Sequence, residues 1–465
     1  MHRVTIVVTL VVLFFSLVKP SFAAFTIEDE KKLGKKFYDQ LQEKNILLQE
    51  ATVNEYVRTI GKRLLASGEK SPFHFTFSVI KNSGINAFAT PGGYIYVYEG
   101  LIELTENESE LAGVLAHEIA HVKSRHIAKT IDKSQKISLA SLVAILAGAF
   151  LGGGGEGAAA ITSFSMATAS ALNLKYSREN EEEADRKGMR YLVSCGYDGR
   201  AMLDFLRIMR RYEYYSNSIP SYFLTHPGTG ERIRYLDGLL QVKYTDRGKT
   251  SIVGGLNRVK TILVLGEKTP HEGLTFFKNA LKEDPENVDF LYGLAVVQAQ
   301  IGKTNEALIN FNQALKQLPG DEDILRDLGI CYYKMGRAED AIAALKKVLS
   351  VNKDNPETIL YLGQSYDAIG DYLSALELYE QFKRDHPGNI KVYYNLAMTY
   401  GKINNHGESH FNFGMYFKKK NKPQSALFHF RAALKYFPLE TPKGRIIQQE
   451  INTIVPDSHH TGKRN

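Results

Sequence analysis

The segment His117-Glu118-Ile119-Ala120-His121 lies in a helical run that we expect to extend from about Glu108 to Lys129. Because helix positions i and i+4 share one face, the two imidazoles can bind the same ion. Glu118 lies one position round the helix, close enough to act on a water molecule beside that ion. This spacing is typical of zinc-dependent hydrolysis, with two metal ligands and a general base on one helical turn.

The start and the buried face of this helix are both visible in the sequence. Thr105 with Glu108, or Asn107 with Glu110, forms a capping-box pattern ahead of an apolar run. Apolar residues then recur at helical spacing, which predicts that the helix packs in a core. They are Leu111, Leu115, Ile119 and Val122.

A third metal ligand must come from outside this motif. A metzincin-type site would need glycine and histidine where Ser124 and Ile127 stand. His126 is five positions after His121, so on a continuous helix it points away from the ligands. We therefore expect a packed or surface histidine at this position.

An acidic run further along the chain offers the missing ligand. Residues 177–185 read SRENEEEAD, and Glu181 and Asp185 share a helix face. One carboxylate can bind the metal while the other holds a ligand histidine through its second ring nitrogen. A solvated acidic helix face is the alternative interpretation.

Composition describes an ordinary globular chain of two or three domains. It has 465 residues, of which 44% are hydrophobic and 23% charged. The formal charge of +7, or +5 without Arg3 and Lys19, is too small to predict nucleic-acid binding. Cys195 and Cys331 lie in different predicted domains, so two buried thiols are favoured over one interdomain bridge.

The first 23 residues are expected to be a secretory signal peptide. Arg3 precedes an apolar run from Val4 to Val18, and Ser21-Phe22-Ala23 provides a small-residue cleavage pattern. An uncleaved membrane anchor is the alternative interpretation.

Residues 24–245 predict helices around a small sheet. Residues 25–66 have the periodicity of two helices, and residues 73–79 and 94–98 alternate as strands. The nearly uncharged stretch 137–174 predicts buried or amphipathic helices near the site, with membrane-surface contact as the alternative. Proline and glycine in residues 221–232 predict an irregular loop whose His226 and Arg232 could reach the site, although for either residue alone a surface position is favoured.

From about Thr269 the sequence repeats every 34 residues. Ala307, Ala341 and Ala375 mark the period, which is typical of the paired helices of tetratricopeptide repeats. Ala426 is out of phase, since 426 − 375 is 51, and we attribute this offset to an extra helix over 393–403 and a break at 404–407. Such repeats stack on one continuous core and present a concave surface.

These motifs together resemble the zinc peptidases related to HtpX and the CaaX prenyl proteases. The resemblance is closer to their exported, repeat-bearing branch, the periplasmic β-barrel assembly-enhancing proteases. The segments that carry it cover, with the repeats, nearly the whole mature chain. They are NAFATPGG at 86–93, the helical zinc motif with Arg125-His126 after it, residues 177–185, Thr225-His226-Pro227 and Arg232.

The resemblance implies one Zn²⁺ per chain, held by His117, His121 and Glu181. It implies that Asp185 supports the site and that Glu183 is not a ligand. It also implies that residues 86–93 shape the substrate cleft. The substrate-binding residues we expect are Asn86, Ala87, Phe88, Gly93 and Arg232.

The expected fold class is α+β, mostly α: a zincin-type metallopeptidase domain with a small β-sheet, followed by an α-solenoid of repeats. We place the signal peptide at 1–23, the peptidase domain at 24–245 and a linker at 246–268. The repeat domain then covers 269–440, and a C-terminal tail covers 441–465.

The expected mechanism uses Glu118 to take the proton of the attacking water and pass it to the leaving amine. His226 is the first candidate for stabilising the oxyanion, ahead of Tyr222 and Arg232. Alternatively, His226 occupies the fourth zinc position and keeps the resting enzyme inactive. A peptide substrate would lie extended along a strand edge.

The expected function is exported, periplasmic proteolysis of unfolded or misassembled envelope proteins. The repeats would select the client and could dock on an outer-membrane assembly machinery, with no nucleic-acid partner and at most peripheral membrane contact. The alternative is a non-proteolytic assembly chaperone or scaffold with a latent peptidase domain.

Overall fold

The computed structural model describes residues 25–66, 70–132, 137–151, 176–216 and 221–454. The predicted signal peptide, residues 152–174 of the uncharged stretch and the end of the C-terminal tail lie outside these ranges. The chain divides into two compact units, Met1–Leu263 and Val264–Asn465.

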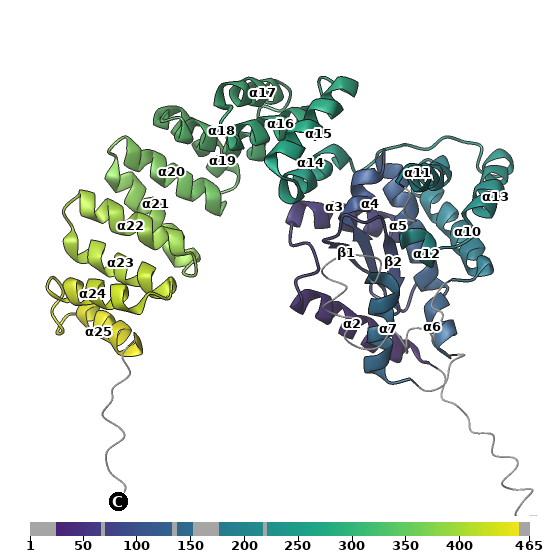
Figure 1. Cartoon of the computed structure of the whole chain (residues 1–465), viewed down its shortest axis with the longest axis horizontal. Helices are drawn as coiled ribbons and strands as arrows, with labels where there is room; N and C mark the ends of the chain where they lie inside the picture. The colour runs from purple at the N-terminus through teal and green to yellow at the C-terminus, as the bar shows by residue number, and fades with distance from the viewer. Residues whose placement is uncertain (1–24, 67–69, 133–136, 152–175, 217–220, 455–465) are drawn as a thin grey trace, which may run out of the picture. The chain divides into compact units, whose positions relative to one another are not determined.

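The first unit is built around a three-stranded sheet of order β1-β3-β2 (Figure 1). β1 (Thr76–Ile80) pairs with β3 (Tyr94–Tyr98) in parallel, and β2 (Ala87–Thr90) pairs with β3 antiparallel. The sequence predicted β1 and β3 but not β2. Since β2 is only four residues long and contains two alanines, its propensity signal is weak.

Both faces of the sheet are buried, because successive side chains of each strand enter different cores. On one face, β-strand residues such as Val79, Ile95 and Val97 share a core with α3 (Ala51–Ala66), α5 (Glu108–Lys123), α10 (Arg178–Ser194) and α11 (Arg200–Ser216). On the other face, aromatic residues including Phe88 and Tyr96 share a core with α2 (Ile27–Glu43), α6 (His126–Asp132) and α7 (Leu139–Leu151).

Helix α5 carries the histidine motif and lies at the centre of the first unit. All of its residues from Glu108 to Val122 are buried. Its N-cap is Asn107, whose side chain accepts from the backbone N–H of Glu110, as one of the two predicted caps requires. The predicted single helix to Lys129 is wrong: α5 ends at Lys123, Arg125 has a φ of 56°, and α6 begins at His126.

Two further predictions about the first unit need revision. The region 221–232 was expected to be irregular, but it contains α12 (Ser221–Thr225) and the start of α13 (Thr229–Val242). Its Pro227 and Gly228 occupy only the connection between these helices. The region 246–268, expected as a linker, contains α14 (Leu256–Glu267). One further short helix, α4 (Glu99–Leu104), follows β3 directly.

The segment before α14 is tied to the start of α5 by the carboxylate of Glu108. This buried group accepts the backbone N–H groups of Ile252, Val253 and Gly254 at 2.9, 2.7 and 2.6 Å. It also accepts the Tyr197 hydroxyl at 2.8 Å. Burial raises the pKa of Glu108, but these donors outweigh burial and hold it below its usual value.

Helix α7 confirms that the first part of the uncharged stretch is a buried helix. It is 13 residues long, and the carbonyl of Phe150 near its end accepts the Tyr98 hydroxyl at 2.7 Å. None of the helices in the described ranges is long and apolar enough to cross a bilayer.

The second unit consists of antiparallel helices that repeat every 34 residues. The first helices of four successive pairs begin at 288, 322, 356 and 390. Residues 390–419 are therefore a unit in phase, with Leu396-Ala397 at the repeat positions, and not an inserted helix as predicted. The helices are α15 (Pro270–Glu283), α16 (Val288–Gln300), α17 (Thr304–Gln317), α18 (Glu322–Lys334), α19 (Ala338–Val351), α20 (Pro356–Ala368), α21 (Tyr372–Asp385), α22 (Ile390–Lys402), α23 (His406–Lys419), α24 (Pro423–Leu434) and α25 (Pro442–Ile454).

The phase shift near Ala426 has a different origin from the predicted one. Helix α23 packs against both α22 and α24, so it closes one repeat and also opens the next. Gly414 of α23 lies against the ring of Phe430 in α24, as Gly363 of α20 lies against Tyr379 of α21. The same contact between a glycine and an aromatic ring thus recurs, with α23 now in the position of the first helix of a pair.

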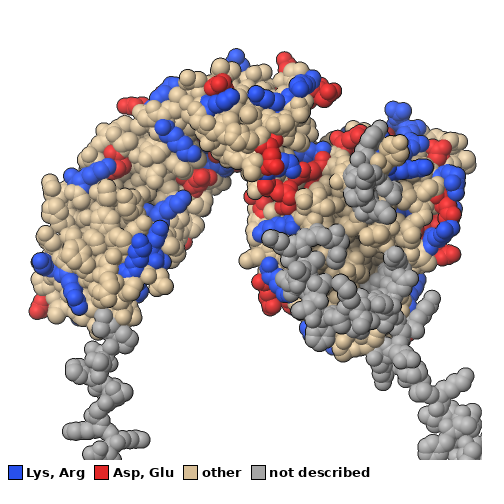
Figure 2. All heavy atoms as spheres, viewed as in Figure 1, with Lys and Arg blue, Asp and Glu red and all other residues tan. Residues whose placement is uncertain are grey.

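The surface and the cysteines match an ordinary globular chain. Cationic and anionic side chains are interspersed on the visible face of each unit (Figure 2). Cys195 and Cys331 are both buried and neither forms a disulfide with a described residue, as predicted.

Gly188 allows α10 to lie directly on α5. A Cβ atom at Gly188 would lie 3.0 Å from the backbone nitrogen of His117 and 3.1 Å from the carbonyl carbon of Ala116. Gly188 is seven residues after Glu181 and three after Asp185, so all three residues face α5.

We expect Gly188→Ala to destabilise the first unit, although alanine is the better helix former. The added methyl group meets the backbone of a helix that is buried on every side, which costs about 1–3 kcal/mol. Thermal melting followed by circular dichroism should show a Tm lowered by roughly 2–12 °C. Gly238→Ala is the matched control, because no atom lies within 4 Å of a Cβ placed there. A variant at Gly188 as stable as this control contradicts the packing argument.

Candidate metal centre

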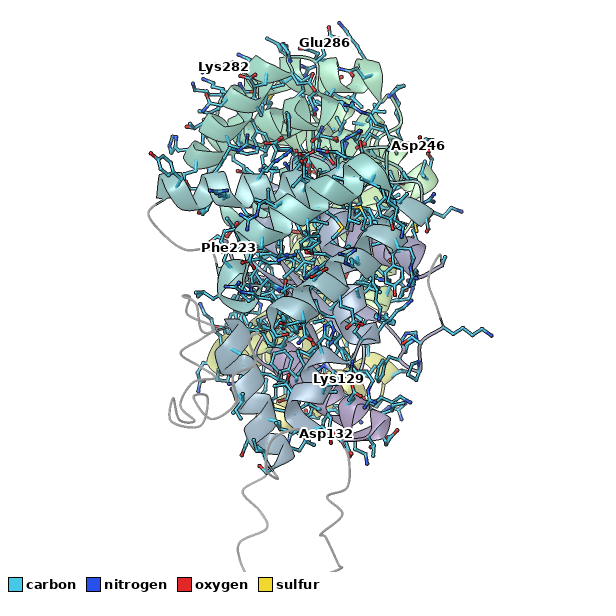
Figure 3. All side chains as sticks on the ribbon, turned by 90° about the vertical axis from the view of Figure 1, so that its right-hand side faces the viewer. Lys129, Asp132, Phe223, Asp246, Lys282 and Glu286 are labelled. Atoms are coloured by element: carbon cyan, nitrogen blue, oxygen red, sulfur yellow. The ribbon has the colours of Figure 1, made fainter. Side chains whose placement is uncertain are left out.

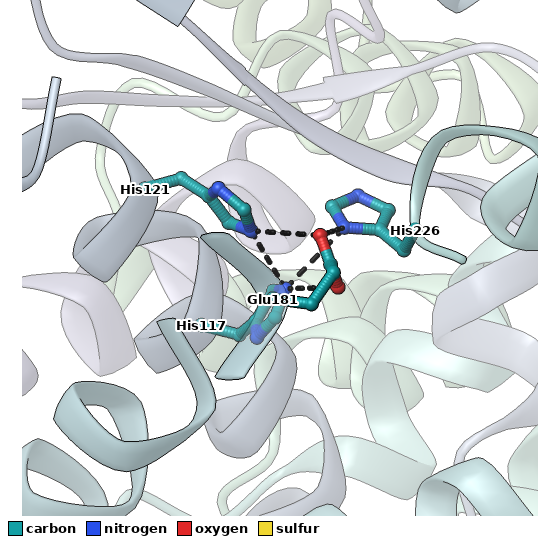
Figure 4. Close-up of side chains that lie close together, drawn as sticks. All are labelled: His117, His121, Glu181 and His226. Atoms are coloured by element: carbon teal, nitrogen blue, oxygen red, sulfur yellow. Dashed lines mark hydrogen bonds and ion pairs between the residues drawn. The ribbon is translucent and has the colours of Figure 1, made fainter. Parts of the chain in front are cut away.

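Four side chains from three regions of the sequence converge beneath the sheet (Figure 4). The potential ligand atoms of His117, His121, Glu181 and His226 all lie within 4.8 Å of one another. His117 Nε2 is 2.9 Å from His121 Nε2 and 3.3 Å from Glu181 Oε2. His121 Nε2 is 3.3 Å from Glu181 Oε1. The predicted pairing of the helical motif with the acidic run is therefore present in space.

The donor set and its spacing fit a divalent metal of the zinc type. Imidazole nitrogen and carboxylate oxygen are zinc ligands, and bonds of about 2.0–2.2 Å in a tetrahedron place the ligand atoms roughly 3.3–3.6 Å apart. The nitrogen–oxygen separations of 3.3 Å match that size, and the two imidazole nitrogens of the motif are closer, at 2.9 Å. All four side chains are buried, so bulk water does not surround the cluster.

Helix α10 fixes the orientation of His117 through Asp185. Asp185 Oδ1 lies 2.8 Å from His117 Nδ1, which leaves Nε2 directed at the cluster. Arg232 donates to both oxygens of Asp185 at 2.7 and 2.8 Å, and its Nη1 lies 2.8 Å from Glu181 Oε2. The Tyr235 hydroxyl donates to Asp185 as well.

The surroundings of the two glutamates shift their pKa values in opposite directions. Burial raises the pKa of Glu181, but His226, Arg232 and His117 outweigh it and hold that pKa well below the usual value. Burial raises the pKa of Glu118, whose two oxygens have no hydrogen-bond partner among the described residues. Glu181 therefore stays ionised, whereas Glu118 is suited to accepting a proton.

The two histidines of α5 also differ. Burial lowers the pKa of His117, but Glu181 and Asp185 counteract it and raise the value to about 9. Burial, followed by the neighbouring His117 charge, holds the pKa of His121 well below its usual value. His121 is therefore neutral at pH 7 and ready to act as a ligand.

His226 joins the cluster because α12 holds it there. The Tyr222 N–H and the Ser221 hydroxyl both donate to the Ile85 carbonyl, at 3.2 and 3.1 Å, which places α12 beside the start of β2. The Tyr222 ring stacks on the His226 ring at 4.4 Å. His226 Nδ1 lies 3.1 Å from Glu181 Oε1, and its Nε2 lies 3.5 Å from Glu118 Oε1.

The side chains expected to contact substrate lie mostly in the core. The Asn86 amide donates to the Phe150 carbonyl at 3.3 Å, and the Phe88 ring stacks on the Phe150 ring at 4.4 Å. Gly93 lies in the β2–β3 turn, where a Cβ atom would meet the His74 carbonyl oxygen at 2.3 Å. Arg232 is buried beside the cluster. Of the expected substrate-binding segment, the backbone of β2, which includes Ala87, lies at the edge of the sheet.

Two residues lie beside the cluster where the sequence did not place them. His126 is a packed histidine, which was one of the two expectations, but it does not point away from the ligands: it is buried against His121, with the two Nδ1 atoms 2.9 Å apart. Its direction follows from the left-handed backbone at Arg125, which no spacing rule reveals. The Tyr176 ring covers His121 with ring centroids 3.7 Å apart; its position just before the acidic run was the available signal.

Comparison with known proteins separates the chain into the same two parts. Residues 51–240 match the family model described as peptidase family M48. Tetratricopeptide repeat models match residues 270–322, 302–363 and 357–389.

Several curated proteins are similar to the first part. The beta-barrel assembly-enhancing protease of Yersinia pestis is 34% identical over 214 residues, which are 45% of this chain and 44% of its own length. The protein of the same name from Escherichia coli strain K12 is 34% identical over 209 residues, 44% of this chain and 42% of its own length. The mitochondrial metalloendopeptidase OMA1 of Schizosaccharomyces pombe is 31% identical over 182 residues, 39% and 51% of the two chains.

The matched region spans less than half the length of the two bacterial relatives. Residues 51–240, which match the family model, include every residue of the cluster, from His117 to His226. Residues 51–240 therefore form a metallopeptidase domain of family M48, and tetratricopeptide repeats follow it in the chain.

Proposed function

We propose that the chain is a zinc-dependent endopeptidase with one metal ion per chain. The observation that carries this proposal is the convergence of His117, His121 and Glu181 next to Glu118, a buried glutamate whose two oxygens accept no hydrogen bond from the described residues. Ligands of this kind beside a free carboxylate suit hydrolysis better than a purely structural metal site. Bound there, zinc supplies a Lewis acid that polarises the scissile carbonyl and acidifies water near neutral pH.

Glu118 acts as the general base and acid. Its raised pKa and its two available oxygens allow it to take a proton from the attacking water and return it to the leaving amine. Asp185 positions His117 and does not contact the substrate, since it is buried between His117 and Arg232. Arg232 balances the charge of Asp185 and Glu181, so we assign it to support of the site and not to substrate binding.

His226 is proposed as a fourth ligand that keeps the resting site closed. Its Nδ1 lies within 3.3 Å of both His117 Nε2 and Glu181 Oε1. His226, Tyr222 and Tyr176 are also buried beside the site, with the His226 ring between the other two. A substrate carbonyl requires the position that His226 takes, so α12 must move before hydrolysis.

The substrate is proposed to bind as an extended peptide along β2. β2 is the last strand in the sheet order and lies beside α5, so its outer backbone edge is nearest to the cluster. Pairing with backbone groups gives affinity with loose sequence preference. That property suits clients recognised by their unfolded state.

We propose that the protein acts on misfolded or misassembled proteins of a Gram-negative envelope, after export through the leader at 1–23. Relatives named beta-barrel assembly-enhancing proteases support this assignment. The repeats would dock clients or an outer-membrane assembly machinery on their concave surface. The burial of the cluster side chains supports a second candidate, an assembly chaperone whose peptidase domain is latent.

We expect Glu118→Gln to keep bound zinc and to abolish cleavage of an unfolded protein such as casein. The amide fills the same space but cannot take the proton, so the rate should fall by about 10²–10⁴. Metal analysis and casein digestion, with and without a chelator, measure both properties. Glu181→Ala is the paired variant and should lose the metal. If Glu118→Gln retains full assembly function in cells, the chaperone candidate is favoured.

We expect His226→Ala to retain zinc and to cleave casein faster than the natural protein. Three ligands remain, and loss of the imidazole vacates the position that the substrate carbonyl needs. The initial rate at saturating casein is the measurement. A lower rate with zinc still bound would show instead that His226 stabilises the oxyanion.

A further inference from the structure

We propose that His126 and Glu183 position the ligand His121, through a hydrogen-bond chain with fixed tautomers. The proposal rests on the metal site of the proposed function. It assigns a positioning role to two residues that neither bind the metal nor contact the substrate.

The chain of contacts runs outward from the cluster. His121 presents one ring nitrogen to the other ligands and the second away from them (Figure 4). That second atom, Nδ1, lies 2.9 Å from His126 Nδ1. His126 Nε2 in turn lies 3.2 Å from Glu183 Oε2. His126 is 1% exposed, so water does not compete for either ring nitrogen.

Only one arrangement of protons satisfies all of these contacts. His121 binds the metal through Nε2, so its proton is on Nδ1, which donates to His126. His126 Nδ1 must therefore be an acceptor, which places its own proton on Nε2. That N–H donates to the Glu183 carboxylate. Through this hydrogen-bond chain His121 gains an acceptor that fixes its ring orientation and its basicity as a ligand. Asp185 provides the same to His117 directly.

Glu183 is itself held in place. Its Oε1 accepts the Ser124 hydroxyl at 2.9 Å and the Lys187 ammonium at 2.7 Å. Ser124 is the C-cap residue of α5, and Lys187 is one turn further along α10 than Glu183. The two helices that supply the metal ligands therefore also fix the end of this hydrogen-bond chain.

The backbone at Arg125 is what turns His126 toward His121. On a continuous helix, five positions at about 100° each would place the two side chains roughly 140° apart. The φ of 56° at Arg125 ends α5 and redirects the chain into α6. A left-handed non-glycine residue is costly and persists where its surroundings hold it.

Contacts from the beginning of the described chain hold this turn. Arg125 pairs with the buried Glu30 at 2.6 Å and donates to the Phe25 carbonyl at 3.0 Å. The Phe25 N–H donates to Asp132, which lies with Lys129 on α6 (Figure 3). The strained residue is thus fixed on both sides of the turn.

The test separates the two ring nitrogens of His126. Asparagine places its amide near Nδ1 and keeps an acceptor for His121, whereas glutamine places its amide near Nε2 and keeps only the contact with Glu183. We expect His126→Gln to weaken zinc binding by about 10–100-fold and His126→Asn to weaken it much less. Competition with a chromophoric zinc chelator gives the two Kd values, without reference to activity.

Two comparisons keep the outcome unambiguous. Glu183→Leu should weaken zinc binding, while Glu179→Leu on the exposed side of the same helix should not. Circular dichroism melting shows whether each variant is folded. Equal Kd values for His126→Gln, His126→Asn and the natural chain overturn the positioning role. A natural chain that binds no zinc overturns the proposed function instead.

Discussion

The packing of α10 on α5 is the contact on which the rest of the first unit depends. It buries the carboxylates of Glu181 and Asp185 in the protein interior, where a lone charge is very costly. Each carboxylate is therefore surrounded by donors, namely His117, Arg232 and the other cluster residues. The need to pair these two buried charges fixes the positions of the cluster side chains. The arrangement of the site therefore does not depend on a bound substrate.

The sequence predicted what local periodicity determines. The i, i+4 spacing of His117 with His121, and of Glu181 with Asp185, placed both pairs correctly on helix faces. The alternation of Tyr94 to Tyr98 predicted β3, and the 34-residue period predicted the helix pairs of the second unit. These signals depend on neighbours within a few turns of the chain, so one sequence is sufficient to read them.

The errors occurred where tertiary contacts determine the backbone. Nothing in the sequence around Arg125 shows that Glu30, almost a hundred residues earlier, will hold it in a left-handed conformation. The predicted direction of His126, away from the ligands, assumed a continuous helix without that turn and was therefore wrong. β2 forms because β3 and two cores surround it, and not because Ala-Phe-Ala-Thr favours a strand. The buried position of Arg232 likewise depends on the two carboxylates of another helix.

The same packing argument indicates which part of the proposed site can open. Helices α5 and α10 hold each other through buried charges, so separating them exposes uncompensated groups at high cost. Helix α12 has only five residues, and the Ile85 carbonyl accepts both the Tyr222 N–H and the Ser221 hydroxyl. Local opening of a short segment requires less free energy than unfolding of the whole unit. If His226 closes the resting site, its release thus requires only the displacement of a short helix, and the ligand geometry set by α5 and α10 survives the opening.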